Sequence, residues 1–309
     1  MPYSPDSTRA ALLLTNRVVT LDAKPLSARE FWQLVEQVDP GDLLHDDTAG
    51  LMERLGVSRE EADRLRTLLD ASTALGFEQE RLHDSGITLV SALDDSFPTA
   101  LHDRLGTACP PFLLVAGPVE WLRRPGLGIV GSRDADDHAR DVARRAAELA
   151  VHEHWPVVSG LARGVDQVAM TAALDAGGSV VGIPAEGILR VSRNAEIRRR
   201  VHAGELCIAS PYGPEAPFRA GNAMGRNKIV HGLSRATFVV ASDRDAGGTW
   251  AGATEAIDRR YAPVAVWSGP GAGDGNEALI RRGATRITEL RQLAELGPET
   301  ITPPQTTLF

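Results

Sequence analysis

The sequence predicts an α/β protein: an extended Rossmann-like parallel sheet, with a small helical domain before it and a short disordered tail after it. From residue 87 onward, short apolar runs alternate with helical segments, which is typical of βαβ units. The runs are continuous stretches of mainly Val, Ile and Leu, as expected of parallel strands buried on both faces. The predicted strands cover residues 87–90, 112–116, 127–130, 157–159, 180–183, 206–209, 237–241 and 264–267.

The part before the first strand shows helical periodicity. Ser27 begins a segment with apolar residues at helical spacing, and the sequence Asp39-Pro40-Gly41 ends it. A second helix is expected to begin at Ser58, where Ser58 and Glu61 match a capping box. Short connections between these helices predict a small bundle.

We therefore expect three parts. A helical domain covers residues 1–85, a Rossmann-like core covers 86–296, and a flexible tail covers 297–309. The core is expected to end in one or two amphipathic helices over residues 277–296. The tail contains three prolines and no apolar periodicity, which predicts disorder.

Three Gly-rich turns each lie between a predicted strand and a predicted helix: 131–133, 159–166 and 247–252. Such a turn leaves backbone N–H groups free at the positive end of a helix dipole, which favours an anion. In the second turn, Gly160 and Gly164 are expected to let a ligand approach the backbone closely. Because the carboxyl ends of parallel strands meet at one edge of a sheet, we expect the three turns to converge there. The sequence thus predicts a phosphate-binding rim for a nucleotide or a nucleic-acid strand.

Composition limits the other classes of function. The net charge of −8 argues against a protein coated in basic charge, although a local basic rim remains compatible with it. Cys109 and Cys207 have no metal-ligand spacing, so neither a metal site nor a disulfide is expected. Membrane-length apolar stretches and a signal-peptide pattern are absent from the sequence, which predicts a cytoplasmic protein without membrane contact.

Several stretches then occur in a distinctive order: Phe97-Pro98 with Pro110-Pro111, 129–133, 159–166, 225–230 with 232–234, and 247–249. In this order and spacing, the chain resembles the DNA-processing protein A (DprA, or Smf) family, whose core is an extended Rossmann domain. The helical N-terminal part also occupies the place of that family's sterile-alpha-motif-like domain. The resemblance implies single-stranded DNA binding and delivery of the strand to a RecA-type recombinase in recombination or DNA uptake. It implies a homodimer, no catalysis and no cofactor.

The resemblance and the three turns together indicate which residues form the phosphate-binding rim. The expected DNA- or phosphate-binding residues are Gly131, Ser132, Arg133, Ser159, Gly160, Arg163, Gly164, Arg226, Asn227, Lys228, Gly247, Gly248 and Thr249. Arg163 and Arg226 are expected at loop or helix-start positions, where substitution costs little packing. Asp166 is expected in the first turn of its helix, where its negative charge interacts favourably with the helix dipole, rather than in a catalytic role.

The chain also departs from the family pattern. Lys228 stands where the family commonly has an arginine, and the turn at 247–252 differs from the family's own. That turn is somewhat similar to one in LOG-type nucleotide-processing enzymes, with Glu255 in the place of their glutamate. The alternatives are therefore a LOG-type nucleotide-binding protein or phosphoribohydrolase, in which Glu255 assists bond cleavage beside Arg226, and a nucleotide-sensing regulator. An inward-pointing Glu255 in a closed pocket would favour the enzyme.

Other residues carry two interpretations each. The basic run of Arg193 and Arg198–Arg200 is either a solvated helix face or a DNA contact. Phe218, Tyr212 and Trp250 could stack on bases or pack in the core. Transformation, repair and phage defence are all compatible with the sequence.

The last residues of the sequence resemble a short docking motif. Gln305, Leu308 and Phe309 match the Gln-x-x-Leu-Phe peptide by which bacterial repair and replication proteins bind the sliding clamp. A disordered segment would present Leu308 and Phe309 as apolar anchors for a hydrophobic pocket. The sequence therefore predicts the sliding clamp as a further partner.

Overall fold

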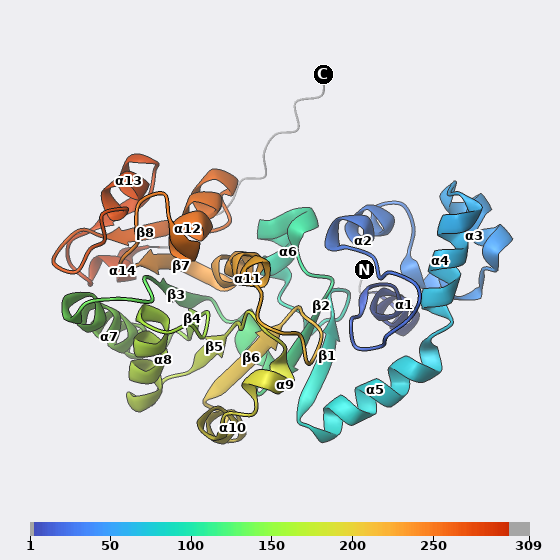
Figure 1. Cartoon of the computed structure of the whole chain (residues 1–309), viewed down its shortest axis with the longest axis horizontal. Coiled ribbons are helices and arrows are strands. Elements are labelled where there is room, and N and C mark those ends of the chain that lie inside the picture. Colours follow the sequence, from blue (N-terminus) through green and yellow to red (C-terminus); the bar gives the residue numbers. More distant parts are fainter. Residues whose placement is uncertain (1–2, 297–309) are drawn as a thin grey trace.

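The computed structural model describes residues 3–296. The sequence before residue 85 folds into helices (Figure 1). They are α1 (Pro5–Thr15), α2 (Ala28–Val35), the short 3-10 helix η1 (Pro40–His45), α3 (Thr48–Leu55), α4 (Arg59–Leu69) and α5 (Ser72–Asp84). Ser27 and Glu30 form a complete capping box at α2. At α4 the expected box is half formed: Glu61 N–H donates to Ser58 Oγ, but the Glu61 carboxylate pairs with Arg64 instead.

The rest of the chain builds one nine-stranded sheet. Its strands are β1 (Ile87–Ser91), β2 (Phe112–Ala116), β3 (Gly126–Val130), β4 (Val157–Ser159), β5 (Val180–Gly182), β6 (Leu206–Ser210), β7 (Ser234–Val239), β8 (Val264–Trp267) and β9 (Thr285–Ile287). The strand order is β1-β2-β6-β5-β4-β3-β7-β8-β9. From β3 the chain therefore moves outward through β4, β5 and β6, and then crosses back to β7. This reversal between β3 and β7 is the switch point of a Rossmann-like sheet.

Helices cover both faces of the sheet. They include α6 (Thr99–Leu105), α7 (Asp137–His152), α8 (Val165–Asp175), α9 (Ile188–Val191), α10 (Ala195–His202), α11 (Ala220–Leu233), α12 (Gly247–Arg259), α13 (Asn276–Arg281) and α14 (Gln292–Glu295), with the 3-10 helices η2 (Gly106–Ala108) and η3 (Val119–Arg123). In Figure 1, α7 and α8 lie below the central strands, and α11 and α12 lie above them. The N-terminal helices adjoin the β1 end of the sheet, where the Trp32 indole N–H donates to the Cys109 carbonyl at 2.9 Å.

The α/β class and the predicted strands are confirmed, with three corrections. β2 runs antiparallel to both its neighbours, so the sheet is mostly rather than wholly parallel. The segment 277–296 contains β9 between two short helices, and sequence reasoning missed this strand because Thr285 and Arg286 are exposed and leave no apolar run. The third Gly-rich turn is already helical, since α12 begins at Gly247. Within residues 3–296, no helix is long and apolar enough to span a bilayer.

Candidate functional site

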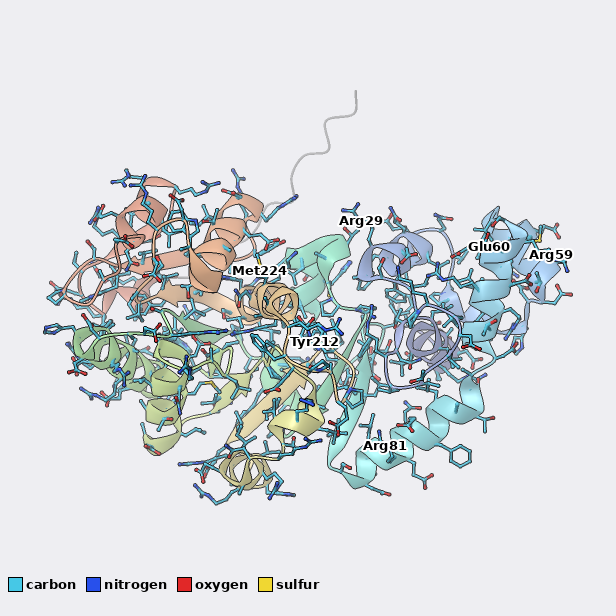
Figure 2. The ribbon with its side chains drawn as sticks, in the orientation of Figure 1. Arg29, Arg59, Glu60, Arg81, Tyr212 and Met224 are labelled. Carbon is cyan, nitrogen blue, oxygen red and sulfur yellow. The ribbon has the colours of Figure 1, made fainter. Side chains whose placement is uncertain are left out.

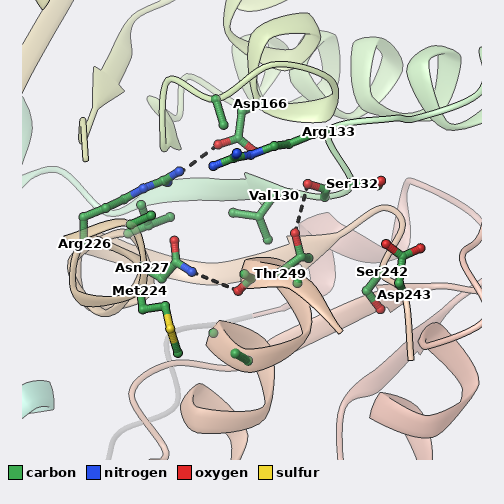
Figure 3. Close-up of a pocket in the computed structure, with 18 of the residues that line it drawn as sticks. Val130, Ser132, Arg133, Asp166, Met224, Arg226, Asn227, Ser242, Asp243 and Thr249 are labelled. Atoms are coloured by element: carbon green, nitrogen blue, oxygen red, sulfur yellow. Dashed lines mark hydrogen bonds and ion pairs between the residues drawn. The ribbon is translucent and has the colours of Figure 1, made fainter. Parts of the chain in front are cut away.

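The three Gly-rich segments meet at one edge of the sheet, as predicted. They follow β4, β3 and β7, which are adjacent and parallel. A cavity of about 590 Å³ opens at this edge, beside the β3–β7 switch point (Figure 3). We call it the first cavity. Its walls are residues 130–134 after β3, the start of α12 and one face of α11, with Ala162 and Asp166 from the α8 side.

A buried ion pair forms the inner wall of the first cavity. Arg226 reaches from the middle of α11 to Asp166 on α8, with Nη1 3.6 Å from Oδ2. Both side chains are less than a tenth exposed. Burial raises the pKa of Asp166, whereas the Arg226 charge and the Gly160 N–H, which donates to Oδ2 at 3.0 Å, oppose the rise. Arg226 Nε has no hydrogen-bond partner within residues 3–296. Arg226 is thus a packed interior residue, and the expectation that its replacement costs little packing is wrong.

The glycines of the second turn serve this packing rather than ligand approach. A Cβ atom at Gly160 would overlap the Arg226 guanidinium. Gly164, at a φ of +80°, packs against the backbone carbonyls of Ser132 and Arg133. The Gly160 N–H is also already used by Asp166, so it is not free for a phosphate. The expectation of close ligand approach at these two glycines is therefore corrected: both allow neighbouring turns to interlock.

The mouth of the first cavity combines positive charge with exposed apolar surface. The Arg133 guanidinium carbon lies 5.7 Å from the centroid of the Phe218 ring. Phe218 is 52% exposed and Met224 is 53% exposed, and both line the cavity. Of the five large apolar side chains that are exposed in residues 3–296, two therefore lie at this one opening. Exposed aromatic and thioether surface beside an arginine suits the stacking of a base.

Electrostatics at the inner wall are unbalanced. Arg133 and Arg226 both point toward Asp166 (Figure 3). Burial lowers the pKa of Arg226, the Asp166 charge opposes this, and the nearby Arg133 charge adds to the lowering. Arg133 makes no ion pair within residues 3–296. At this wall two guanidinium groups face one carboxylate, and Arg133 is the one of the two without an ion-pair partner in the part of the chain that the structure describes. Asp134 and Asp243 also line the cavity, and Asp243 lies beside Ser242 at the right of the view. Over the whole cavity, the two arginines are therefore offset by three carboxylates.

The start of α12 adds backbone donors. Its N-cap residue, Ala246, has no side chain that can accept from the first turn. Asn227 Nδ2 donates to the Gly248 carbonyl at 2.9 Å, and Thr249 Oγ1 donates to the Gly131 carbonyl at 2.9 Å. These two bonds tie α11, α12 and the turn after β3 together. The uncapped end of a 13-residue helix is held at the cavity and favours an anion there.

The structure divides the expected rim residues into two groups. Eight line the first cavity: Gly131, Ser132, Arg133, Arg226, Asn227, Gly247, Gly248 and Thr249. The other five do not. Ser159 is buried and donates to the Ile129 carbonyl, Gly160 and Gly164 are packed inside the turns, and Arg163 is exposed outside the cavity. The fifth is Lys228.

Lys228 and Glu255 pair with each other, away from the first cavity. Lys228 Nζ lies 3.0 Å from Glu255 Oε1, which also accepts from the Tyr261 hydroxyl at 3.1 Å. Neither residue lines the first cavity. Glu255 therefore does not face the site in which Arg226 would hold a nucleotide, as the hydrolase interpretation requires.

Two other sequence features have structural roles. In the basic run, Arg199 and Arg200 pair with Glu196, and Arg200 also pairs with Asp175 and Glu205. Trp250 packs against the core and does not line the first cavity. Within residues 3–296, His, Cys, Asp and Glu form no cluster of three that could hold a metal ion.

Sequence reasoning missed a second cavity, also of about 590 Å³, on the other side of α11. It lies between that helix, the loop before it, the α1–α2 connection and the segment before β2. Its charged lining residues are Arg17, Arg219 and Lys228. Arg17 and Arg219 stand in no recognisable motif, so only the folded arrangement brings them together.

The first comparison with known proteins concerns the core. Residues 88–297 match the model of the DNA recombination-mediator protein A family. The chain belongs to this family. Related proteins include Protein Smf of a Synechocystis strain, 31% identical over 61% of this chain and 49% of that protein. The DNA processing protein DprA of Bacillus subtilis is 29% identical over 62% of this chain and 65% of that protein. The match thus spans about half to two thirds of these two relatives.

Two solved structures share the fold. The X-ray structure of DNA processing protein A from Streptococcus pneumoniae superimposes with a TM-score of 0.64 at 21% identity, over 88% of this chain and 98% of that one. A Helicobacter pylori DNA processing protein A, described for its single-stranded DNA binding mode, gives 0.56 at 20% identity, over 68% and 94%. These likenesses confirm the extended Rossmann-like architecture.

Proposed function

We propose that this chain binds single-stranded DNA in the first cavity, without catalysing a reaction on it. The observation that carries the proposal is the placement of Arg133, unpaired within the described residues, beside the Arg226–Asp166 ion pair and the exposed side chains of Phe218 and Met224. A phosphate would pair with Arg133, which has no ion-pair partner within residues 3–296, and a base would cover the apolar surface. The family and the Helicobacter pylori relative, described for its binding of single-stranded DNA, support the choice of ligand.

Each part of the cavity has a role in this proposal. Arg133 and the first amides of α12 contact phosphates, while Phe218 and Met224 stack against bases. Arg226 supports the wall from inside. Such binding is largely independent of base sequence, because phosphates and π-faces are common to all nucleotides. Duplex DNA binds less well, since its bases are already stacked and paired.

The same proposal covers the wider role. The chain acts as a dimer in the cytoplasm and presents the bound strand to a RecA-type recombinase during recombination or DNA uptake. Family membership supports this role. Co-sedimentation of a RecA-type recombinase with protein-coated single strands tests it, and equal recombinase loading with and without this protein contradicts it.

The sliding clamp is proposed as a further partner through Gln305, Leu308 and Phe309, which lie outside the described residues. Support comes from the sequence motif and from the need to cover an adjacent Leu–Phe pair. A pull-down with the clamp compares the full chain with a variant truncated after Pro304. Loss of retention in the truncated variant is expected, and equal retention excludes the motif.

Fluorescence anisotropy tests DNA binding directly, with an oligothymidine, a matched duplex and AMP as ligands. We expect the single strand to bind best, with an affinity that falls steeply between about 50 and 200 mM salt. Arg133→Ala should weaken binding and reduce the salt slope by about 0.7, the value for one phosphate contact on a single strand. Arg163→Ala is the matched control, because this exposed arginine lies in the neighbouring turn but outside the first cavity. Tight binding of AMP with no binding of the oligothymidine would exclude the proposal.

A further inference from the structure

The second cavity differs from the first in its charge. Arg17, Arg219 and Lys228 line it, and its lining contains no carboxylate. Within residues 3–296, Arg17 and Arg219 make no ion pair, whereas Lys228 is engaged by Glu255. By contrast, three carboxylates line the first cavity. The second cavity is therefore the more strongly positive of the two.

Much of the remaining lining of the second cavity is apolar. The buried residues Pro110, Pro111 and Phe112 come from the segment before β2 and from its first residue, and the more exposed Pro211 and Pro217 come from the loop before α11. Tyr212 also lines the cavity, and its hydroxyl donates to the Asn222 carbonyl at 2.6 Å. Burial raises the pKa of Tyr212 to about 12, so the ring stays neutral at physiological pH. Cations around an apolar floor suit a planar ligand that carries a phosphate.

The N-terminal helical part supplies one of these cations through a fixed turn. Asn16, at the end of α1, accepts from the Val18 and Val19 N–H groups at 3.2 and 3.1 Å. Its Nδ2 donates back to the Leu12 carbonyl at 2.8 Å, and the side chain is buried. The Arg17 carbonyl also lies against Gly213 in the opposite wall. Arg17 is therefore presented to the cavity by a rigid turn rather than by a loose connection.

The two cavities lie on opposite sides of α11. Ala220, Ala223 and Met224 face the first cavity, while Arg219, Asn222 and Gly225 face the second. Tyr212 packs on the second-cavity side of α11, where its hydroxyl donates to the Asn222 carbonyl, and both Tyr212 and Met224 are labelled near the centre of the view in Figure 2. Met224 and Arg219 are exposed, so the start of α11 offers a path between the openings. An α-helix with its side chains is about 10 Å wide, which a flexible single strand can cross.

We propose that the second cavity is a further nucleotide subsite for the strand that occupies the first cavity, and that Arg17 and Arg219 bind its phosphates. This proposal rests on the proposed function of the first cavity. In this proposal the strand leaves the first cavity, passes over the start of α11 and enters the second cavity between the α1–α2 connection and the core. The N-terminal helical part therefore contacts the DNA directly. The subsite takes any base, because its floor offers stacking surface and few groups that read base edges.

The test measures affinity for oligothymidines of increasing length. Wild-type protein should gain affinity once the strand is long enough to leave the first cavity and reach the second. In Arg17→Ala/Arg219→Ala, that gain should be lost and the salt slope for long strands reduced by about 1.4, the value for two phosphate contacts. Binding of short strands should not change. Arg9→Ala, which removes an exposed arginine of α1 that lines neither cavity, is the matched control.

The outcomes separate this proposal from the first. Unchanged length dependence in the double variant, with short strands still sensitive to Arg133→Ala, overturns the second subsite alone. Absence of any single-strand binding by the wild-type protein overturns both. Tight binding of dTMP that is lost in Arg17→Ala, with no competition by long oligothymidine, assigns the cavity to a free nucleotide and overturns the proposal. Photocrosslinking of a 5-iododeoxyuridine strand to Tyr212 gives a second readout, expected for long strands and absent for short ones.

Discussion

Gly160 and Arg226 occupy adjoining space so closely that the first can have no side chain. The Arg226 guanidinium crosses the position that a Cβ atom at residue 160 would fill, and there it meets Asp166. The Gly160 N–H donates to the same carboxylate. The turn resembles a phosphate-binding loop, but Gly160 is needed in it to make room for the internal ion pair between Arg226 and Asp166.

Gly160→Ala is expected to destabilise the fold and to disturb the first cavity. The added methyl group must displace the guanidinium, and overpacking of this kind costs about 1–3 kcal/mol. Thermal unfolding and single-strand affinity should both decline. Gly76→Ala is the control, because a Cβ atom at that position in α5 meets nothing within 4 Å and helix propensity favours alanine by up to about 1 kcal/mol. Equal stability of the two variants would show that Arg226 has room to move.

Arg226→Ala should lower the free energy of unfolding by about 3–5 kcal/mol, because it leaves the Asp166 carboxylate buried without its partner. Arg133→Ala should leave stability nearly unchanged, since Arg133 is exposed and makes no ion pair within residues 3–296. Chemical denaturation of the two variants measures the difference. Similar stability of the two variants would mean that the buried Asp166 carboxylate no longer carries an unpaired charge in Arg226→Ala, because it is protonated or hydrated.

The fold and the convergence of the Gly-rich turns could be predicted from the sequence, whereas the inner arrangement of the candidate site could not. Strands β4 and β8 were predicted to the residue because buried parallel strands produce continuous apolar runs. The convergence of three turns follows from parallel topology alone. β9 was missed because it is a short, largely exposed edge strand without an apolar run.

The arrangement inside the site depends on helix geometry and on contacts across the fold. Arg226 and Lys228 stand two residues apart on α11, so they point about 200° apart around the helix and enter different cavities. Sequence reasoning grouped them by charge. Arg17 is more than 200 residues from Arg219 along the chain, and only the docking of the helical part on the core brings them to one cavity.

Glu255→Gln is expected to leave binding of short single strands unchanged, because Glu255 does not line the first cavity. The substitution weakens the ion pair with Lys228. If the second cavity binds the strand, the freed lysine should strengthen binding of long strands, and anisotropy over the oligothymidine series measures this. Wild-type release of free base from a nucleoside monophosphate, lost in this variant, would instead support the nucleotide hydrolase.

Because His231 is buried, we expect the protein to lose stability in mild acid. It lies buried at the base of the first cavity, with Nδ1 2.9 Å from Thr237 Oγ1. Burial, followed by the nearby Arg226 charge, lowers its pKa from 6.5 to about 4. The unfolded chain therefore binds this proton more readily than the folded one, so stability is present above about pH 6.5 and is lost as pH falls toward 4. A shift of this size corresponds to about 3 kcal/mol over the whole window.

Thermal unfolding between about pH 7 and pH 5 tests this, because most carboxylates stay ionised over that range. His231→Gln should flatten the pH dependence, since glutamine keeps a polar group for Thr237 but does not titrate. His138→Gln, at an exposed position of α7, is the control and should keep the wild-type slope. His102 on α6 also has a pKa lowered by burial, so some slope should remain in His231→Gln. An unchanged slope in His231→Gln would assign the acid sensitivity to other groups. It would mean that water reaches His231 through the cavity, because a hydrated imidazole contributes little to the pH dependence of stability.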